Sequence, residues 1–78
     1  MIPYVEPEIG EICEVVSHNP ECSAVGAIVV ADPEQIRWVS VGSHVMVINV
    51  LSGNQVRWCN VIFNSELVEI SSDLLRPL

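Results

Sequence analysis

The stretch that decides the fold is VMVINVLSGNQVRWCNVIF, residues 45–63. It consists of two apolar, β-branched runs separated by a short polar segment that contains Gly53 and Asn54. A Gly-Asn pair between such runs is typical of a two-residue β-hairpin turn. The sequence therefore predicts a hairpin over residues 45–63, with Gly53 and Asn54 as its turn.

This turn fixes which side chains share a face of the hairpin, because successive residues of a strand point to opposite sides. It places Val50 opposite Arg57 and Ile48 opposite Cys59. The face that contains these pairs has an aliphatic, thiol and aromatic centre, and we expect it to form the core. Its central members are Met46, Ile48, Cys59, Val61 and Phe63.

The other face of the hairpin combines apolar anchors with uncharged amides, a mixture typical of protein interfaces. We expect it either to bind a protein partner or a second copy of the chain, or to be covered by the N-terminal arm or the final turn. The candidate interface consists of Trp58, Val45, Val47, Leu51, Ile62, Asn49 and Asn60.

The rest of the chain also has the pattern of short strands. Turn residues recur about every eight to twelve positions, and no apolar period of 3.6 persists, which predicts a small all-β barrel or sandwich. Pro3 and Pro7 predict an extended arm over residues 1–8 of a single domain, 1–78. Gly26 predicts a bulge or bend. Further strands are expected at 11–17, 24–31, 36–41 and 67–70.

The C-terminal segment SSDLL, residues 71–75, predicts one helical or 3₁₀ turn. Ser71 or Ser72 would cap it, and Asp73 would lie near its positive end. Pro77 prevents a long continuation.

The order of these segments resembles an SH3-like barrel: a first strand after IGEIC, then VGAIVV, a hairpin through VLSGNQ, and ELVEISSDLLRPL as a strand that runs into a one-turn helix. The closing SSDLLRPL is also similar to the C-termini of short, uncharacterised SH3-like proteins of bacteriophages and mobile elements. The resemblance implies a five- to six-stranded SH3-like barrel with a short C-terminal 3₁₀ turn. It implies no catalytic activity.

Charge narrows the classes of partner. Ten Asp and Glu residues oppose three arginines, there is no lysine, and the net charge is -7. Binding a phosphate backbone or an anionic membrane surface requires clustered basic residues. We therefore expect neither direct nucleic-acid binding nor membrane binding, whereas a basic protein would suit the acidic surface.

Size and hydropathy favour an interface. Half of the 78 residues are apolar, and mean hydropathy is +0.45, although so short a chain can enclose only a small core. Some apolar surface should therefore lie outside the core. The N-terminal residues lack the pattern of a secretory leader and no apolar run is long enough to span a membrane, so we expect neither a leader nor a membrane span. Its three cysteines, an odd number, favour a reducing cytoplasmic location.

Metal and catalytic chemistry have little support. Cys13, His18 and Cys22, joined by Cys59 or His44, are weak candidates for zinc ligands. Their spacing does not match a zinc knuckle, and single cysteines commonly pack as small apolar residues. We therefore predict no metal, no cofactor and no catalytic residues.

The predicted function is a non-enzymatic protein-interaction module that self-associates or binds a host protein through the outer face of residues 45–63. One alternative is an acidic mimic of nucleic acid that inhibits a host DNA- or RNA-binding protein, as an anti-defence factor would. The other is an enzyme whose site forms at an oligomer interface.

Overall fold

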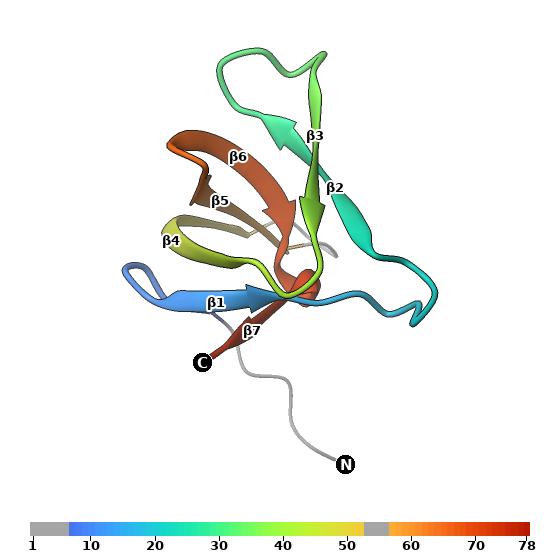
Figure 1. Cartoon of the computed structure of the whole chain (residues 1–78). Coiled ribbons are helices and arrows are strands. Elements are labelled where there is room, and N and C mark those ends of the chain that lie inside the picture. The colour runs from blue at the N-terminus through green and yellow to red at the C-terminus, as the bar shows by residue number, and fades with distance from the viewer. Residues whose placement is uncertain (1–6, 53–56) are drawn as a thin grey trace.

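A computed structural model describes residues 7–52 and 57–78 of the chain (Figure 1). The all-β prediction is confirmed: the described residues form a seven-stranded antiparallel sheet in the order β3-β2-β6-β5-β4-β1-β7. The elements are β1 (Ile12–Val15), β2 (Ala24–Val29), β3 (Ile36–Ser40), β4 (His44–Ser52), β5 (Arg57–Phe63), β6 (Glu66–Ser71), the 3₁₀ turn η1 (Ser72–Leu74) and β7 (Leu75–Pro77).

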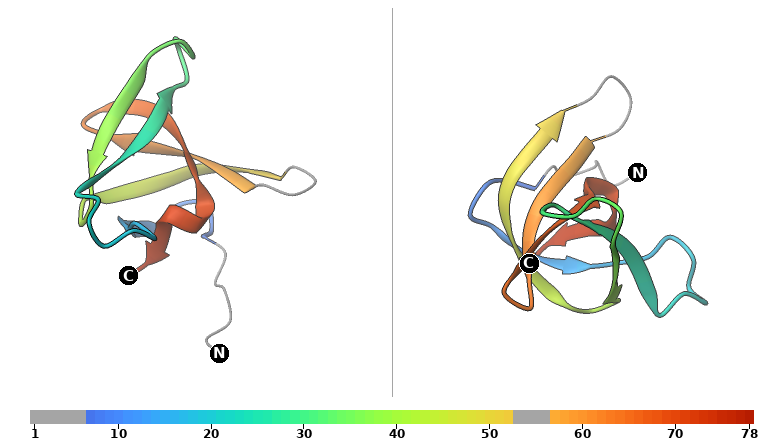
Figure 2. Two further views of the ribbon diagram at one scale, coloured as in Figure 1. Left: turned by 90° about the vertical axis from the view of Figure 1, so that its right-hand side faces the viewer. Right: turned by 90° about the horizontal axis from the view of Figure 1, so that it is seen from above.

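The sheet is strongly curved. Figures 1 and 2 show the β2–β3 hairpin standing beside β5 and β6, with β1 and β7 crossing the opposite end of the sheet. In the described part of the chain β3 and β7 are edge strands that do not pair with each other. The sheet is thus open, and the closed SH3-like barrel that the resemblance implies is not confirmed.

The core lies on the inner face that the curved sheet encloses. Alternate residues of the strands point inward, as the period of two requires, and most are valines, which suit a pleated surface. The predicted core residues Cys59 and Val61 are fully buried, and Phe63 packs against the core. The core residues are Cys13, Val15, Val25, Ala27, Val29, Val39, Val45, Val47, Cys59, Val61, Val68, Ile70 and Leu75.

The predicted register of the 45–63 hairpin is wrong. Ser52 pairs with Arg57, so β4 and β5 enclose residues 53–56 instead of Gly53 and Asn54 alone. The predicted turn itself lies outside the described residues. Farther along, the pairing shifts at Ile48, where a β-bulge adds one residue to β4.

The bulge exchanges the two faces of β4. Because one extra residue reverses the alternation beyond it, Val47 pairs with Val61 on the inner face. Val45 and Val47 are therefore buried core residues, and their assignment to an interface was wrong. Met46 and Ile48, which we expected in the core, are instead 43% and 41% exposed.

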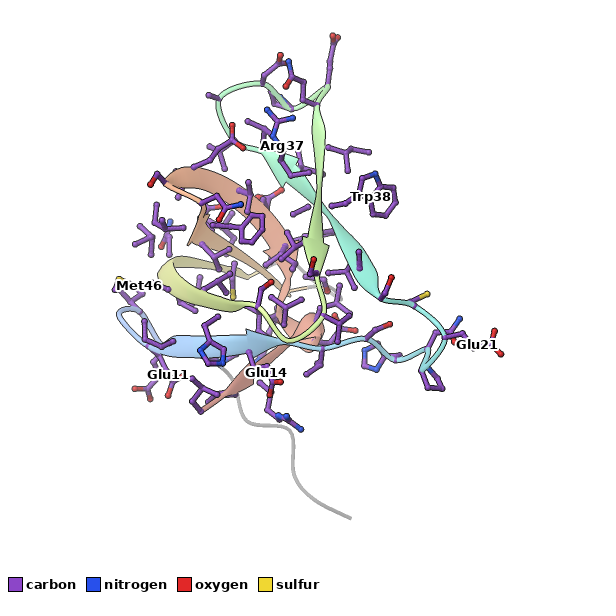
Figure 3. The ribbon with its side chains drawn as sticks, viewed as in Figure 1. Glu11, Glu14, Glu21, Arg37, Trp38 and Met46 are labelled. Atoms are coloured by element: carbon purple, nitrogen blue, oxygen red, sulfur yellow. The ribbon has the colours of Figure 1, made fainter. Side chains whose placement is uncertain are left out.

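Gly26 does not form the predicted bulge. It pairs regularly with Trp38 in the β2–β3 ladder. A Cβ atom at this position would lie 3.5 Å from Ile36 Cγ2 and 3.7 Å from Trp38 Cζ3. The neighbouring side chains thus occupy the space beside the glycine, which explains how a strand interior accommodates it. Trp38 itself is 71% exposed and points away from the ribbon (Figure 3).

The predicted one-turn helix is confirmed as η1, which follows Ser71 and leads into β7. Ser71 makes no capping hydrogen bond to the backbone. Its hydroxyl donates to the carboxylate of Asp73 instead. The predicted arm over residues 1–8 lies mostly outside the described residues; of its last two, Pro7 is buried and Glu8 is exposed.

Candidate protein-interaction surface

A row of apolar side chains crosses four adjacent strands on the outer face of the sheet and reaches Val30, which directly follows β2. Ile12 of β1 pairs with Met46 of β4, Met46 pairs with Ile62 of β5, and Ile62 pairs with Leu67 of β6. The row continues to Val30, at the end of β2, whose N–H donates to the Leu67 carbonyl at 3.2 Å. Because paired residues point to the same face, the side chains of Ile12, Met46, Ile62 and Leu67 lie side by side, and the backbone hydrogen bond to Leu67 places Val30 next to them as the fifth residue of the set. We call them the apolar row.

The apolar row is open to solvent. Ile12, Val30, Met46 and Ile62 are all exposed, and Leu67 is half-buried. Figure 3 shows Met46 projecting away from the ribbon. Scattered exposed apolar residues are normal on a protein surface. An uninterrupted row across four strands and Val30 is a contiguous patch, which is the arrangement expected of a binding surface.

The sequence identified only part of this surface. Of the predicted interface residues, Ile62 belongs to the row. Leu51 and Asn49 are exposed on the same face, opposite half-buried Trp58 and Asn60. Met46 was missed because of the bulge. Ile12 and Val30 were missed because the residues of one strand do not reveal which strand will lie next to it.

A pocket of about 280 Å³ lies next to the apolar row. Strand pairing brings three of its lining residues together, since Glu69 of β6 pairs with Asn60 of β5 on one side and with Ile28 of β2 on the other. Its volume is at the lower end of those that hold small molecules. The lining residues are Ile28, Val29, Val30, Pro33, Leu51, Asn60 and Glu69.

Two polar side chains, those of Glu69 and Asn60, line this pocket. Asn60 Oδ1 is buried and accepts no hydrogen bond from the described residues. The neighbouring Asn49 differs, because its Oδ1 accepts a hydrogen bond from the Val50 N–H at 3.0 Å. Buried polar atoms in native proteins nearly always have a partner. Asn60 Oδ1 is therefore an exception in the described part of the chain, because it is a buried side-chain oxygen without a hydrogen-bond partner.

Arg37 and Arg76 each form an ion pair with a glutamate in the described part of the chain. Arg37 Nε donates to Glu66 Oε1 at 2.9 Å, joining β3 to β6. Arg76 of β7 donates to Glu14 of β1. These contacts use the arginines to connect strands, and their charge is offset by the carboxylates that they contact.

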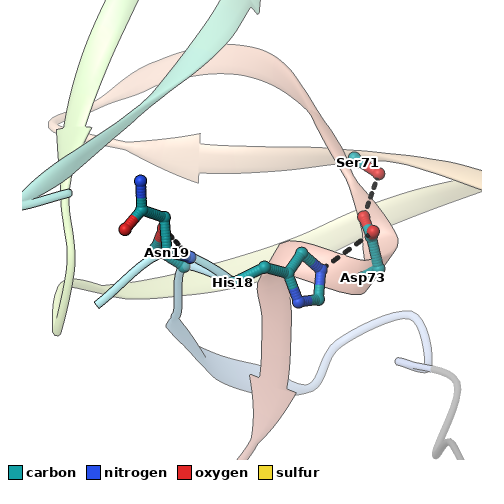
Figure 4. Close-up of polar contacts among 5 residues, drawn as sticks. His18, Asn19, Ser71 and Asp73 are labelled. Carbon is teal, nitrogen blue, oxygen red and sulfur yellow. Dashed lines mark hydrogen bonds and ion pairs between the residues drawn. The ribbon is translucent and has the colours of Figure 1, made fainter. Parts of the chain in front are cut away.

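His18, Asp73 and Ser71 form a cluster that joins the β1–β2 loop to η1 (Figure 4). His18 Nε2 lies 3.0 Å from Asp73 Oδ2, and Ser71 Oγ donates to Asp73 Oδ1. The hydrogen bond from Ser71, followed by that with His18, lowers the pKa of the Asp73 carboxyl. Catalytic serines require the histidine as their base. Here Ser71 and His18 each contact Asp73, so the cluster differs from a catalytic triad, in which the serine contacts the histidine.

The predicted metal candidates are not gathered into one site. Cys13 and Cys59 are buried in the core, Cys22 is exposed, and exposed His18 contacts Asp73. Burial raises the pKa of the Cys13 thiol to about 11, which disfavours the thiolate that zinc binds. Exposed His44 lies at the start of β4. Across residues 7–52 and 57–78, no three His, Cys, Asp or Glu side chains are arranged to hold a metal ion.

No helix within the described residues is long and apolar enough to cross a membrane.

Comparison with known proteins gives no relative on which a function could be based. The chain matches no protein-family model, no curated protein and no solved structure.

Proposed function

We propose that this chain is a non-enzymatic protein-interaction module with SH3-like connectivity, and that it binds another protein through the apolar row. The observation that carries the proposal is the exposure of apolar side chains from four adjacent strands and from Val30, which follows β2, on the outer face. Covering such a row with a partner removes apolar surface from water, which is the main favourable contribution to protein association.

Strand connectivity supports the SH3-like part of the proposal. Strands β4, β5 and β6 are consecutive antiparallel neighbours. Turn η1 then connects β6 to β7, which returns beside β1. This order, with a one-turn helix before the last strand, is the order on which the resemblance to SH3-like barrels rests.

Charge favours a different protein over a second copy of the chain. Each copy carries a net charge of -7, so two copies repel each other, whereas a basic partner is attracted. The alternative of an acidic nucleic-acid mimic needs unengaged carboxylates gathered on one face. Glu14, Glu66 and Asp73 are instead engaged by Arg76, Arg37 and the His18–Ser71 cluster, which favours the interaction module.

The test is a capture experiment with a matched pair of variants. Ile62→Asp places a charge in the apolar row. Ile9→Asp makes the same chemical change at a residue that is 67% exposed and lies before β1, outside the row. Tagged wild-type and variant chains would be incubated with bacterial lysate, and bound proteins would be identified by mass spectrometry and then purified.

We expect a protein that the wild type and Ile9→Asp both bind directly and that Ile62→Asp fails to bind. Circular dichroism would establish that both variants keep the β fold. Equal binding by Ile62→Asp and Ile9→Asp, or no partner for the wild type, would contradict the proposal.

A further inference from the structure

The pocket beside the apolar row combines apolar walls with the side chains of Glu69 and Asn60. Leu51, Ile28 and Pro33 contribute apolar surface from three different segments. Glu69 and Asn60 occupy paired positions on β6 and β5. The pocket is therefore suited to a group that is apolar along its length and polar at its end.

The polar end must donate hydrogen bonds. Glu69 lines the pocket, and no described cation forms an ion pair with it. No residue that lines the pocket carries a positive charge. An anion would be repelled by Glu69, and a wholly apolar group would leave its carboxylate desolvated and unpaired, which is costly.

A positively charged side chain satisfies all of these conditions. Lysine and arginine both have an aliphatic stem that packs on apolar surface while the charged end reaches a polar site. Arginine fits better, because its planar guanidinium can donate two parallel hydrogen bonds to one carboxylate. Its charge also complements a chain of net charge -7.

We propose that this pocket binds an arginine side chain of the partner protein, with the guanidinium paired to the Glu69 carboxylate. This inference rests on the proposed function, and it specifies the partner's chemistry: apolar residues contact the apolar row, and an adjacent arginine enters the pocket. Val30 belongs to both the row and the pocket lining, so one continuous segment of a partner can reach the two.

The first test uses N-acetyl-arginine amide as the probe and N-acetyl-citrulline amide as its neutral isostere. Both would be titrated into the unmodified ¹⁵N-labelled chain while backbone amide shifts are recorded by NMR. We expect saturable shifts centred on Ile28, Asn60 and Glu69 with the arginine probe. Hydrogen bonds from a charged donor are about twice as strong as those from a neutral donor. The citrulline probe should therefore bind with an affinity at least roughly tenfold lower than that of the arginine probe. Equal affinity for both probes, or no saturable shift, would overturn the inference.

The second test replaces the carboxylate. Glu69→Gln keeps the shape of the side chain and removes its charge. Glu21→Gln is the matched control, since Glu21 is exposed in the β1–β2 loop, away from the pocket (Figure 3). Arginine binding should fall about tenfold in Glu69→Gln and stay unchanged in Glu21→Gln. Equal arginine affinity in the two variants would overturn the inference.

The same variants separate this inference from the proposed function. A captured partner that requires Ile62 but binds Glu69→Gln as tightly as wild type would overturn the arginine pocket and leave the interaction module standing. Selective binding of the arginine probe by a chain that captures no protein would overturn the interaction module and leave the pocket standing.

Discussion

At the scale of single residues, the three cysteines show what can be predicted from the type and number of residues without a structure. Their odd number and scattered spacing already argued against a disulfide framework or a zinc knuckle. Only the strand pairing shows that Cys13 and Cys59 lie in the core while Cys22 is exposed. The difference arises because a strand residue's burial depends on what covers its face, which its neighbours in sequence do not determine.

We predict that the cysteines differ in reactivity. Cys22 should be alkylated rapidly by iodoacetamide in the native protein, because it is exposed. Cys13 should react only after unfolding, since it is buried and burial raises its pKa to about 11. Peptide mass spectrometry after timed labelling would measure both rates, with urea-unfolded protein as the control. Native labelling of Cys13 at a rate close to that of Cys22 would show that the described core is wrong.

Asp73 should make a small contribution to stability that depends on pH. Its hydrogen bonds with Ser71 and His18 lower its pKa below the ordinary value of 3.8. The folded state therefore binds this proton less readily than the unfolded state, so the stabilisation is present at neutral pH and is lost as pH falls through the folded-state pKa. Because Asp73 is exposed, the effect should stay below about 1 kcal/mol.

Thermal unfolding of wild type and Asp73→Asn between pH 2 and about 7 would measure this contribution. The wild type should be the more stable protein at neutral pH, and the two curves should converge at the acid end. Asp32→Asn, at an exposed position in the β2–β3 loop, is the control. A stability difference that persists unchanged at the acid end would contradict the assignment.

At the scale of elements, the sequence correctly predicted the β4–β5 hairpin, but only part of its residues were assigned to the correct face. Cys59, Val61 and Phe63 of β5 point inward as expected. The β4 residues before Ile48 are reversed, because the bulge adds one residue to this strand. Both strands are apolar on both faces, so the alternation of residues in the sequence could not show which face of β4 is buried.

A pair of alanine variants tests this register. Val47→Ala removes two buried carbons and should lower the free energy of unfolding by about 2 kcal/mol. Met46→Ala truncates the adjacent, exposed side chain and should change it by about 0.5 kcal/mol or less. Urea unfolding followed by tryptophan fluorescence would give both values. A larger loss for Met46→Ala than for Val47→Ala would restore the register with Gly53 and Asn54 as the turn.

At the scale of the whole molecule, composition and turn spacing predicted the all-β class, and the one-turn helix before the last strand was predicted from SSDLL. The number of strands and the openness of the sheet were not, because β7 has only three residues and closure depends on contacts between strands far apart in sequence. The apolar row belongs to this scale as well. It arises where β1, β4, β5, β6 and the end of β2 come together.

Net charge predicts the assembly state. We expect a monomer at micromolar concentration and low ionic strength, because two chains of charge -7 repel each other. Light scattering coupled to size-exclusion chromatography would measure the mass of the eluting species, against the chain mass of 8.6 kDa. A stable dimer that Ile62→Asp dissociates would make a second copy, instead of another protein, the occupant of the apolar row.

The most direct test of the central claim is the affinity of the captured, purified partner for wild type, Ile62→Asp and Ile9→Asp, measured by isothermal titration calorimetry. A charge buried within an interface core should weaken binding by about tenfold or more. The predicted result is such a loss for Ile62→Asp and wild-type affinity for Ile9→Asp. Wild-type affinity in both variants would contradict the assignment of the apolar row as the binding surface.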